Sequence, residues 1–194
     1  MDKNGGVMRA KFIAVSLILL MGGPVMAEKS GGAVGNYTIG IGPVGNFYFT
    51  HHRPDLSPGI GALIYFDYRW SPELSTTASV MMQVQDGRNL DGGSNNVVLM
   101  GVPTFDMKYY FITNPSKWDP YAGAGIGYYA VTKGSLGRGL ASGLGAEVGG
   151  GFDYYITPKI SLGAAGYFRS LALLGGGATG LFPVSVSGNF GYHF

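Results

Sequence analysis

The chain has 194 residues, enough for one domain. Charged residues make up 12% of it, about half the share of an ordinary soluble domain, and glycine occurs 35 times. This composition disfavours a soluble enzyme and suits a β-protein that faces lipid. Cysteine is absent, which excludes disulfides and thiolate metal sites.

Residues 1–27 are predicted to be a cleavable signal peptide. Arg9 and Lys11 precede an apolar run over residues 12–21, and Val25 and Ala27 are the small residues expected before a cleavage site. A membrane anchor is the alternative, but the run is short for a membrane-spanning helix. Three of the 13 basic and one of the 11 acidic residues lie in this segment, so ten of each remain. A nucleic-acid partner, which needs a basic surface, is therefore disfavoured.

From residue 28 onward the chain alternates between apolar and polar positions in eight segments. Period-two alternation predicts strands, and about ten residues suffice to cross a bilayer at a tilt. The predicted strands cover residues 36–48, 59–70, 74–85, 96–112, 120–131, 143–156, 160–170 and 184–194. An even number of strands lets the sheet close, which leaves no unpaired edge in lipid.

The predicted connections alternate in length. Those at 51–58, 86–95, 132–142 and 171–180 are longer loops rich in glycine, asparagine or proline, whereas the other three are short. Transmembrane barrels show this asymmetry, with short periplasmic turns and longer outer loops. It predicts that the N- and C-termini are both periplasmic.

Seven ionisable residues within the predicted strands lie on the phase opposite the main apolar row. An Arg or Lys that faces lipid at mid-membrane costs about 2–4 kcal/mol, so the charged phase is predicted to face the lumen. The predicted lumen-facing charged and polar residues are Asp67, Arg69, Gln83, Gln85, Asp106, Lys108, Glu147, Asp153 and Arg169. Their mixed signs favour pairing across a plugged interior, and the alternative is a narrow water path. Glycines on the inward phase are expected to make room for tyrosines such as Tyr65 and Tyr129.

The last strand carries aromatic residues on one phase: Phe190, Tyr192 and Phe194. It resembles the C-terminal signature of bacterial outer-membrane β-barrels, which the barrel assembly machinery is understood to recognise. With the segments 108–111 and 120–128, the pattern over residues 34–194 resembles the small eight-stranded outer-membrane proteins of Gram-negative bacteria, the OmpA-barrel and OmpX-like group. The resemblance implies an all-β fold, an eight-stranded antiparallel transmembrane β-barrel of up-and-down topology, over residues 28–194. It also implies outer-membrane lipids and lipopolysaccharide as surroundings, and we expect a monomer.

Two segments could carry chemistry. Gly40–Gly45 matches GxGxxG, but a dinucleotide site needs a helix after the motif, and here a strand pattern continues. His51, His52, Asp55 and Ser57 share one loop and could in principle form a hydrolase or acyltransferase site. The strand motifs of lipid A-modifying barrels are missing, and no third metal ligand accompanies the two histidines. We therefore predict no catalytic residues, no metal and no cofactor.

The sequence supports three functions, in decreasing order of preference. The first is a non-enzymatic structural or surface protein with a largely plugged polar lumen. The second is a narrow passive channel for small or hydrophobic solutes. The third is a lipid A-modifying enzyme that uses residues 51–57. The resemblance does not separate them, because its members serve as structural anchors, pores, adhesins and enzymes.

Overall fold

A computed structural model describes six segments of the chain. These are residues 36–48, 55–90, 93–113, 117–133, 138–174 and 179–194. The predicted signal peptide lies outside them, as do His51 and His52. Among the described residues, no helix is long and apolar enough to cross a membrane.

The regular structure of the described segments is β-strand throughout, as the period-two alternation predicts. The strands are β1 (Tyr37–Tyr48), β2 (Asp55–Leu56), β3 (Gly59–Arg69), β4 (Leu74–Leu90), β5 (Gly93–Tyr110), β6 (Trp118–Lys133), β7 (Arg138–Thr157), β8 (Ile160–Leu174), β9 (Thr179–Leu181) and β10 (Pro183–His193).

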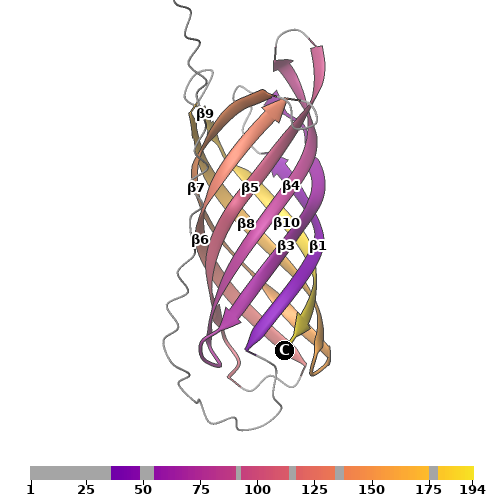
Figure 1. The fold of residues 1–194 in the computed structure, drawn as a ribbon, viewed down its shortest axis with the longest axis vertical. Helices are drawn as coiled ribbons and strands as arrows, with labels where there is room; N and C mark the ends of the chain where they lie inside the picture. The colour runs from indigo at the N-terminus through magenta and orange to yellow at the C-terminus, as the bar shows by residue number, and fades with distance from the viewer. Residues whose placement is uncertain (1–35, 49–54, 91–92, 114–116, 134–137, 175–178) are drawn as a thin grey trace, which may run out of the picture.

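The sheet closes into an antiparallel barrel of eight strand positions. The strands pair in the order β1-β3-β4-β5-β6-β7-β8, and β10 pairs back onto β1, with Tyr192 opposite Ile39. Because β2 and β3 both pair with β4, and β9 and β10 both pair with β8, the ten strands fill eight positions. Figure 1 shows the strands tilted around the barrel, as closure requires. The predicted eight-stranded up-and-down barrel is confirmed.

The two ends of the barrel differ. Tyr37 and Phe194 lie at one end, here called the terminal end, together with the reversals between β3 and β4, β5 and β6, and β7 and β8. Figure 1 places this end at the bottom, where the C-terminus is marked. Tyr48 and Leu174 lie toward the opposite, distal end.

Several strands reach further toward the distal end than predicted. β4 continues to Leu90 and β5 begins at Gly93, where residues 86–95 were expected to form a loop. The ends of β6 to β9 likewise occupy most of the expected loops 132–142 and 171–180. The prediction of three long distal loops is therefore wrong. Glycine and asparagine are weak strand formers, but cross-strand pairing in a hairpin outweighs that intrinsic preference.

Side chains along each strand alternate between an outer face and the interior. On β3, Ile60, Ile64 and Phe66 are exposed on the outer face, whereas Tyr65 and Asp67 are buried inside. Apolar side chains outside and polar ones inside are the arrangement that a barrel in lipid requires.

Inward glycines make room for the interior tyrosines, as expected. A Cβ atom at Gly40 would lie 2.2 Å from Cζ of Tyr65, and one at Gly145 would lie 2.7 Å from the ring of Tyr129. A barrel of eight strands is only wide enough inside for its own side chains. Each large ring therefore fits because a neighbouring strand carries no side chain there.

Candidate functional site

The interior at the terminal end is closed by a network around Arg69 of β3. Its Nη1 donates to Oδ2 of Asp119 on β6 at 2.7 Å and to the hydroxyl of Tyr155 on β7 at 3.2 Å. Nη2 donates to the carbonyl of Pro72 at 2.5 Å, and the guanidinium lies 3.9 Å from the centroid of the Tyr110 ring. The planar, multi-donor guanidinium suits this role, because it can bridge several strands and stack on a ring at once.

A second layer lies one step further in, around Lys108 of β5. Its Nζ is 3.3 Å from Oδ1 of Asp67 on β3 and lies 4.9 Å from the ring centroid of Tyr121 and 5.5 Å from that of Tyr65. The hydroxyls of Ser75 and Thr77 donate to the same Asp67 oxygen, at 3.0 and 2.5 Å. The lysine ammonium thus has a carboxylate and two aromatic faces around it, and its carboxylate partner has two further donors.

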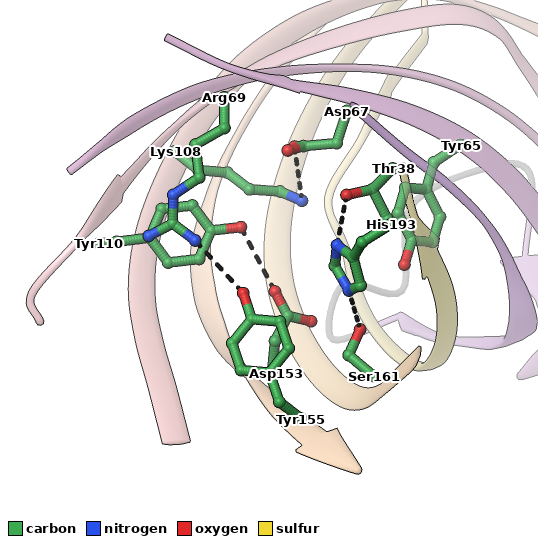
Figure 2. A pocket seen from close by; sticks show the side chains of 10 residues that line it. All are labelled: Thr38, Tyr65, Asp67, Arg69, Lys108, Tyr110, Asp153, Tyr155, Ser161 and His193. Atoms are coloured by element: carbon green, nitrogen blue, oxygen red, sulfur yellow. Dashed lines mark hydrogen bonds and ion pairs between the residues drawn. The ribbon is translucent and has the colours of Figure 1, made fainter. Parts of the chain in front are cut away.

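Between these layers lies a polar cavity, shown in Figure 2. The hydroxyl of Tyr110 donates to Oδ2 of Asp153 at 3.3 Å on one side. On the other, His193 lies between Thr38 and Ser161, with each ring nitrogen 2.8 Å from a hydroxyl oxygen. The cavity has a volume of about 10 Å³, room for about one water molecule. It is too small to hold a solute.

The middle of the barrel is crossed by a chain of polar contacts. Arg169 of β8 pairs with Glu147 of β7 and donates to the hydroxyl of Ser185 on β10, which in turn donates to the side-chain oxygen of Asn46 on β1. All four side chains are buried. They connect four consecutive positions of the closed barrel across the seam where its last and first strands pair.

Apolar side chains fill the distal half of the interior. This apolar plug consists of Leu56, Met81, Val97, Leu99, Tyr129, Val131, Leu171, Leu173 and Leu181, all buried and in mutual contact. The prediction of a polar lumen is therefore wrong for most of this half, where Gln83 and Gln85 are the predicted polar residues that do lie inside. The sequence does contain a signal for an apolar interior, since Val97–Met100 and Leu171–Leu174 are apolar on both phases. A run of this kind indicates a strand with apolar surroundings on both faces.

The residues predicted to face the lumen fall into three groups. The two layers at the terminal end together form the terminal network, which contains Arg69, Lys108, Asp67 and Asp153. The mid-barrel group contains Glu147, Arg169 and Asp106. Gln83 and Gln85 are buried nearer the distal end, where Gln85 accepts a hydrogen bond from the Tyr48 hydroxyl at 2.7 Å.

Asp119 is an interior acid that the sequence prediction missed. The predicted strand begins only at residue 120, yet Asp119 lies on β6 and is fully buried. The sequence signal for an inward Asp119 is its position two residues before Tyr121, on the same phase of the strand.

The three aromatic residues of the last strand are exposed on the outer face at the terminal end. The ring centroids of Phe194 and Tyr192 are 6.3 Å apart, and that of Phe194 is 5.8 Å from Tyr37 of β1. The aromatic row therefore continues across the closure of the barrel.

The segments considered for chemistry give no site among the described residues. Gly40–Gly45 lies inside β1, which continues to Tyr48, so the strand-to-helix context of a dinucleotide site is absent there. Asp55 belongs to β2, with its backbone opposite Arg88. No group of three or more histidine, aspartate or glutamate side chains in the described part of the chain is arranged to hold a metal ion.

The fold and its polarity define a transmembrane β-barrel, with an apolar exterior and a filled interior. Residues 15–194 match the family described as the outer membrane protein beta-barrel domain, so the chain belongs to that family. Membership indicates the outer membrane of a Gram-negative bacterium, where the apolar face is embedded in lipid. Comparison with curated proteins found no match.

Solved structures share the fold at low sequence identity. Neisserial surface protein A (NspA) is similar with a TM-score of 0.66 and 15% identity, covering 84% of this chain and 99% of that chain. OprG from Pseudomonas aeruginosa has a TM-score of 0.56 and 17% identity, covering 84% and 98%. Ail, the attachment invasion locus protein of Yersinia pestis, has a TM-score of 0.54 and 13% identity, covering 84% and 100%.

Proposed function

We propose that this protein is a non-enzymatic outer-membrane barrel with a structural or surface role and a lumen that does not conduct. The observation that carries the proposal is the filling of the interior by two different plugs. The terminal network closes one end with ion pairs and tyrosines, and the apolar plug fills the distal half.

The terminal network supports a permanent plug because its charges have specific partners. Arg69 and Lys108 each contact a carboxylate and an aromatic ring, and Asp67 has hydroxyl donors as well. Breaking such a buried pair leaves an uncompensated charge, at a cost of about 3–5 kcal/mol. A water path through this layer would need both pairs to separate.

Planar-bilayer conductance of the purified protein tests the proposal. We expect no steady channels from wild type or from Lys159→Ala, a control on the exposed terminal surface. Steady, reproducible channels in wild type that are unchanged by Arg69→Ala would refute the plug. Channels whose conductance changes with Arg69→Ala would instead support a narrow pore lined by the network.

One alternative is a passive channel for hydrophobic solutes, which would need the side chains of the apolar plug to move apart. Leu99 and Leu171 are buried in a mainly apolar part of the interior, which a hydrophobic solute could enter if they separated. Entry of a small aromatic solute into proteoliposomes would test this function. Uptake above that of empty liposomes, reduced by Leu171→Trp, would favour the channel, whereas uptake equal to empty liposomes would exclude it.

The orientation and processing of the chain belong to the same proposal. Cleavage after Ala27 would leave the barrel at residues 28–194, with both termini in the periplasm and lipopolysaccharide around the distal end. The exposed row Phe190, Tyr192 and Phe194 supports recognition by the barrel assembly machinery. N-terminal sequencing of the mature protein tests the cleavage site, and protease added to intact cells tests the orientation.

The absence of enzymatic activity is also proposed. The described interior holds ion pairs and structural hydrogen bonds, with no nucleophile beside a base in a cavity large enough for a substrate. Incubation of the purified protein with lipid A, followed by mass spectrometry, should leave the lipid unchanged. A mass shift that is lost in His51→Ala would reinstate the enzyme hypothesis.

A further inference from the structure

The seam between β10 and β1 is interrupted at mid-barrel. Between these two described strands, cross-strand pairing covers residues 38–41 and 44–48 of β1 in one unchanged register, but Gly42 and Pro43 have no partner on β10. On its other side β1 pairs with β3 without a break over residues 37–46, and Pro43 is included there, opposite Ala62. The gap therefore belongs to the seam and not to β1 as a whole.

The gap has a chemical cause, because proline has no backbone N–H to donate. Tyr37 and Phe194 exchange both backbone hydrogen bonds, with N···O distances of 3.2 and 2.9 Å. Such hydrogen-bonded positions recur every second residue along an antiparallel pair, so Pro43 occupies one of them, opposite Gly188. A Cβ atom at Gly188 would lie 3.6 Å from Cγ of Pro43. The two strands are thus in contact at the gap, yet the Gly188 carbonyl receives no donor from Pro43.

The gap divides the seam into a terminal part and a distal part that differ in length. The terminal part has hydrogen-bonded positions at Tyr37, Ile39 and Ile41 of β1, whereas the distal part has them only at Gly45 and Phe47. The described seam has no pair beyond the end of β1, since β9 pairs with β8. The backbone therefore holds the distal part less firmly than the terminal part.

One chain of side-chain hydrogen bonds, here called the distal latch, joins the strands inside the distal part. Ser185 of β10 donates to the side-chain oxygen of Asn46 on β1 and accepts a hydrogen bond from Arg169 on β8. Asn46 and Ser185 stand directly opposite each other, at a position without backbone hydrogen bonds, where facing side chains come closest. Both are buried. The latch thus ties β1 to β10 at a level where the backbone contributes few bonds.

We propose that the seam between β10 and β1 opens distal to the gap at Pro43 and Gly188, and that the distal latch is the contact that keeps it closed. Each backbone bond broken in lipid is costly, so the barrel opens first where the fewest bonds must break. Tyr48, at the distal end of β1, packs against the apolar plug. An opening there brings apolar side chains against lipid, while the terminal network stays closed. The proposal therefore does not depend on whether the lumen conducts.

Distances between spin labels on the barrel in lipid vesicles test for the opening. The chain has no cysteine of its own, so labels attach only at introduced positions. Three directly opposed pairs carry the labels: Phe47→Cys with Val184→Cys across the distal part, Ile39→Cys with Tyr192→Cys across the terminal part, and Ile60→Cys with Val84→Cys between β3 and β4. The β3–β4 pair is the matched control, because it lies toward the distal end in an uninterrupted ladder.

We expect one short distance for all three pairs while the latch is intact. Ser185→Ala should give the distal pair a second, longer distance, with the open fraction raised about tenfold by the lost hydrogen bonds. Thr38→Val should leave the distal pair unchanged, because it removes a hydroxyl contact to His193 in the terminal part of the seam. Adding Pro43→Ala to Ser185→Ala should reduce the longer distance, since an N–H at that position can donate to the Gly188 carbonyl.

Three results would overturn the proposal. The first is a single short distance for the distal pair in Ser185→Ala. The second is a longer distance that appears equally in the β3–β4 pair, since that would report a general loosening of the barrel. The third is a longer distance that Pro43→Ala does not reduce, because the gap would then not be the weak point. Asn46→Ala removes the latch from the β1 side and gives the same test if Ser185→Ala does not fold.

Discussion

Replacing Lys108 by methionine tests whether the terminal network holds the barrel together. The substitution keeps an unbranched side chain as far as the ε position and removes the ammonium that lies 3.3 Å from Asp67. Lys108 is 8% exposed, so solvent screens the pair little. Loss of one partner of a buried ion pair costs about 3–5 kcal/mol. Since Ser75 and Thr77 still donate to Asp67, we expect the lower end, about 3 kcal/mol.

Equilibrium urea unfolding in lipid vesicles measures this cost. Trp70 and Trp118 are exposed on the outer face at the terminal end, so their fluorescence should report the transfer from lipid to water. Lys159→Met is the control: it removes an exposed turn lysine and should change stability by less than about 0.5 kcal/mol.

A double-mutant cycle separates the ion pair from general damage. Asp67→Asn combined with Lys108→Met leaves no unpaired charge, so the double variant should lose less stability than the sum of the two single losses. Strict additivity, or a Lys108→Met loss no larger than that of Lys159→Met, would refute the idea that this pair holds the terminal network.

Three further predictions concern other parts of the barrel. Gly125→Ala should destabilise the barrel by about 1–3 kcal/mol, because its Cβ would lie 2.4 Å from the Phe105 carbonyl oxygen. In the same urea assay Gly166→Ala, whose nearest neighbour would be 3.9 Å away, should be nearly neutral, and equal effects would contradict the packing argument. Leu99→Ala in the apolar plug should cost about 2–5 kcal/mol by urea unfolding, and a loss below 1 kcal/mol would mean that the distal interior is loosely packed. Phe194→Ala should lower the amount of heat-modifiable barrel in outer-membrane fractions, while purified protein refolded in lipid loses only about 1 kcal/mol. Trp118→Ala, which removes an aromatic side chain outside the last strand, should assemble normally, and equal assembly of the two variants would argue against the C-terminal signature.

The alternation along the chain predicted the architecture because a barrel in lipid imposes its pattern locally. Each strand must be apolar on one face and hold its charges on the other, so Asp67 and Arg69, or Asp106 and Lys108, already show which face is inward. The even number of strands and the room made by glycines such as Gly40 follow from the same local constraints.

The distal strand ends were harder to predict, because they depend on pairing. Residues 86–95 have the composition of a loop, yet β4 and β5 remain paired as far as Leu90 and Gly93. Strand propensity is a property of the pair and its neighbours more than of one segment. The apolar plug was missed for a related reason: a strand such as β5 changes its inward face from polar to apolar along its length.

The sequence by itself determined that this chain is a barrel, which face of each strand meets lipid, and that its charges lie inside. These features depend only on the order of residues along single strands. The tertiary structure alone decided which charges meet. Arg69 reaches Asp119 from three strand positions away, and Lys108 reaches Asp67 from two. Such contacts depend on the register and curvature of the closed sheet, which the alternation of one strand does not encode.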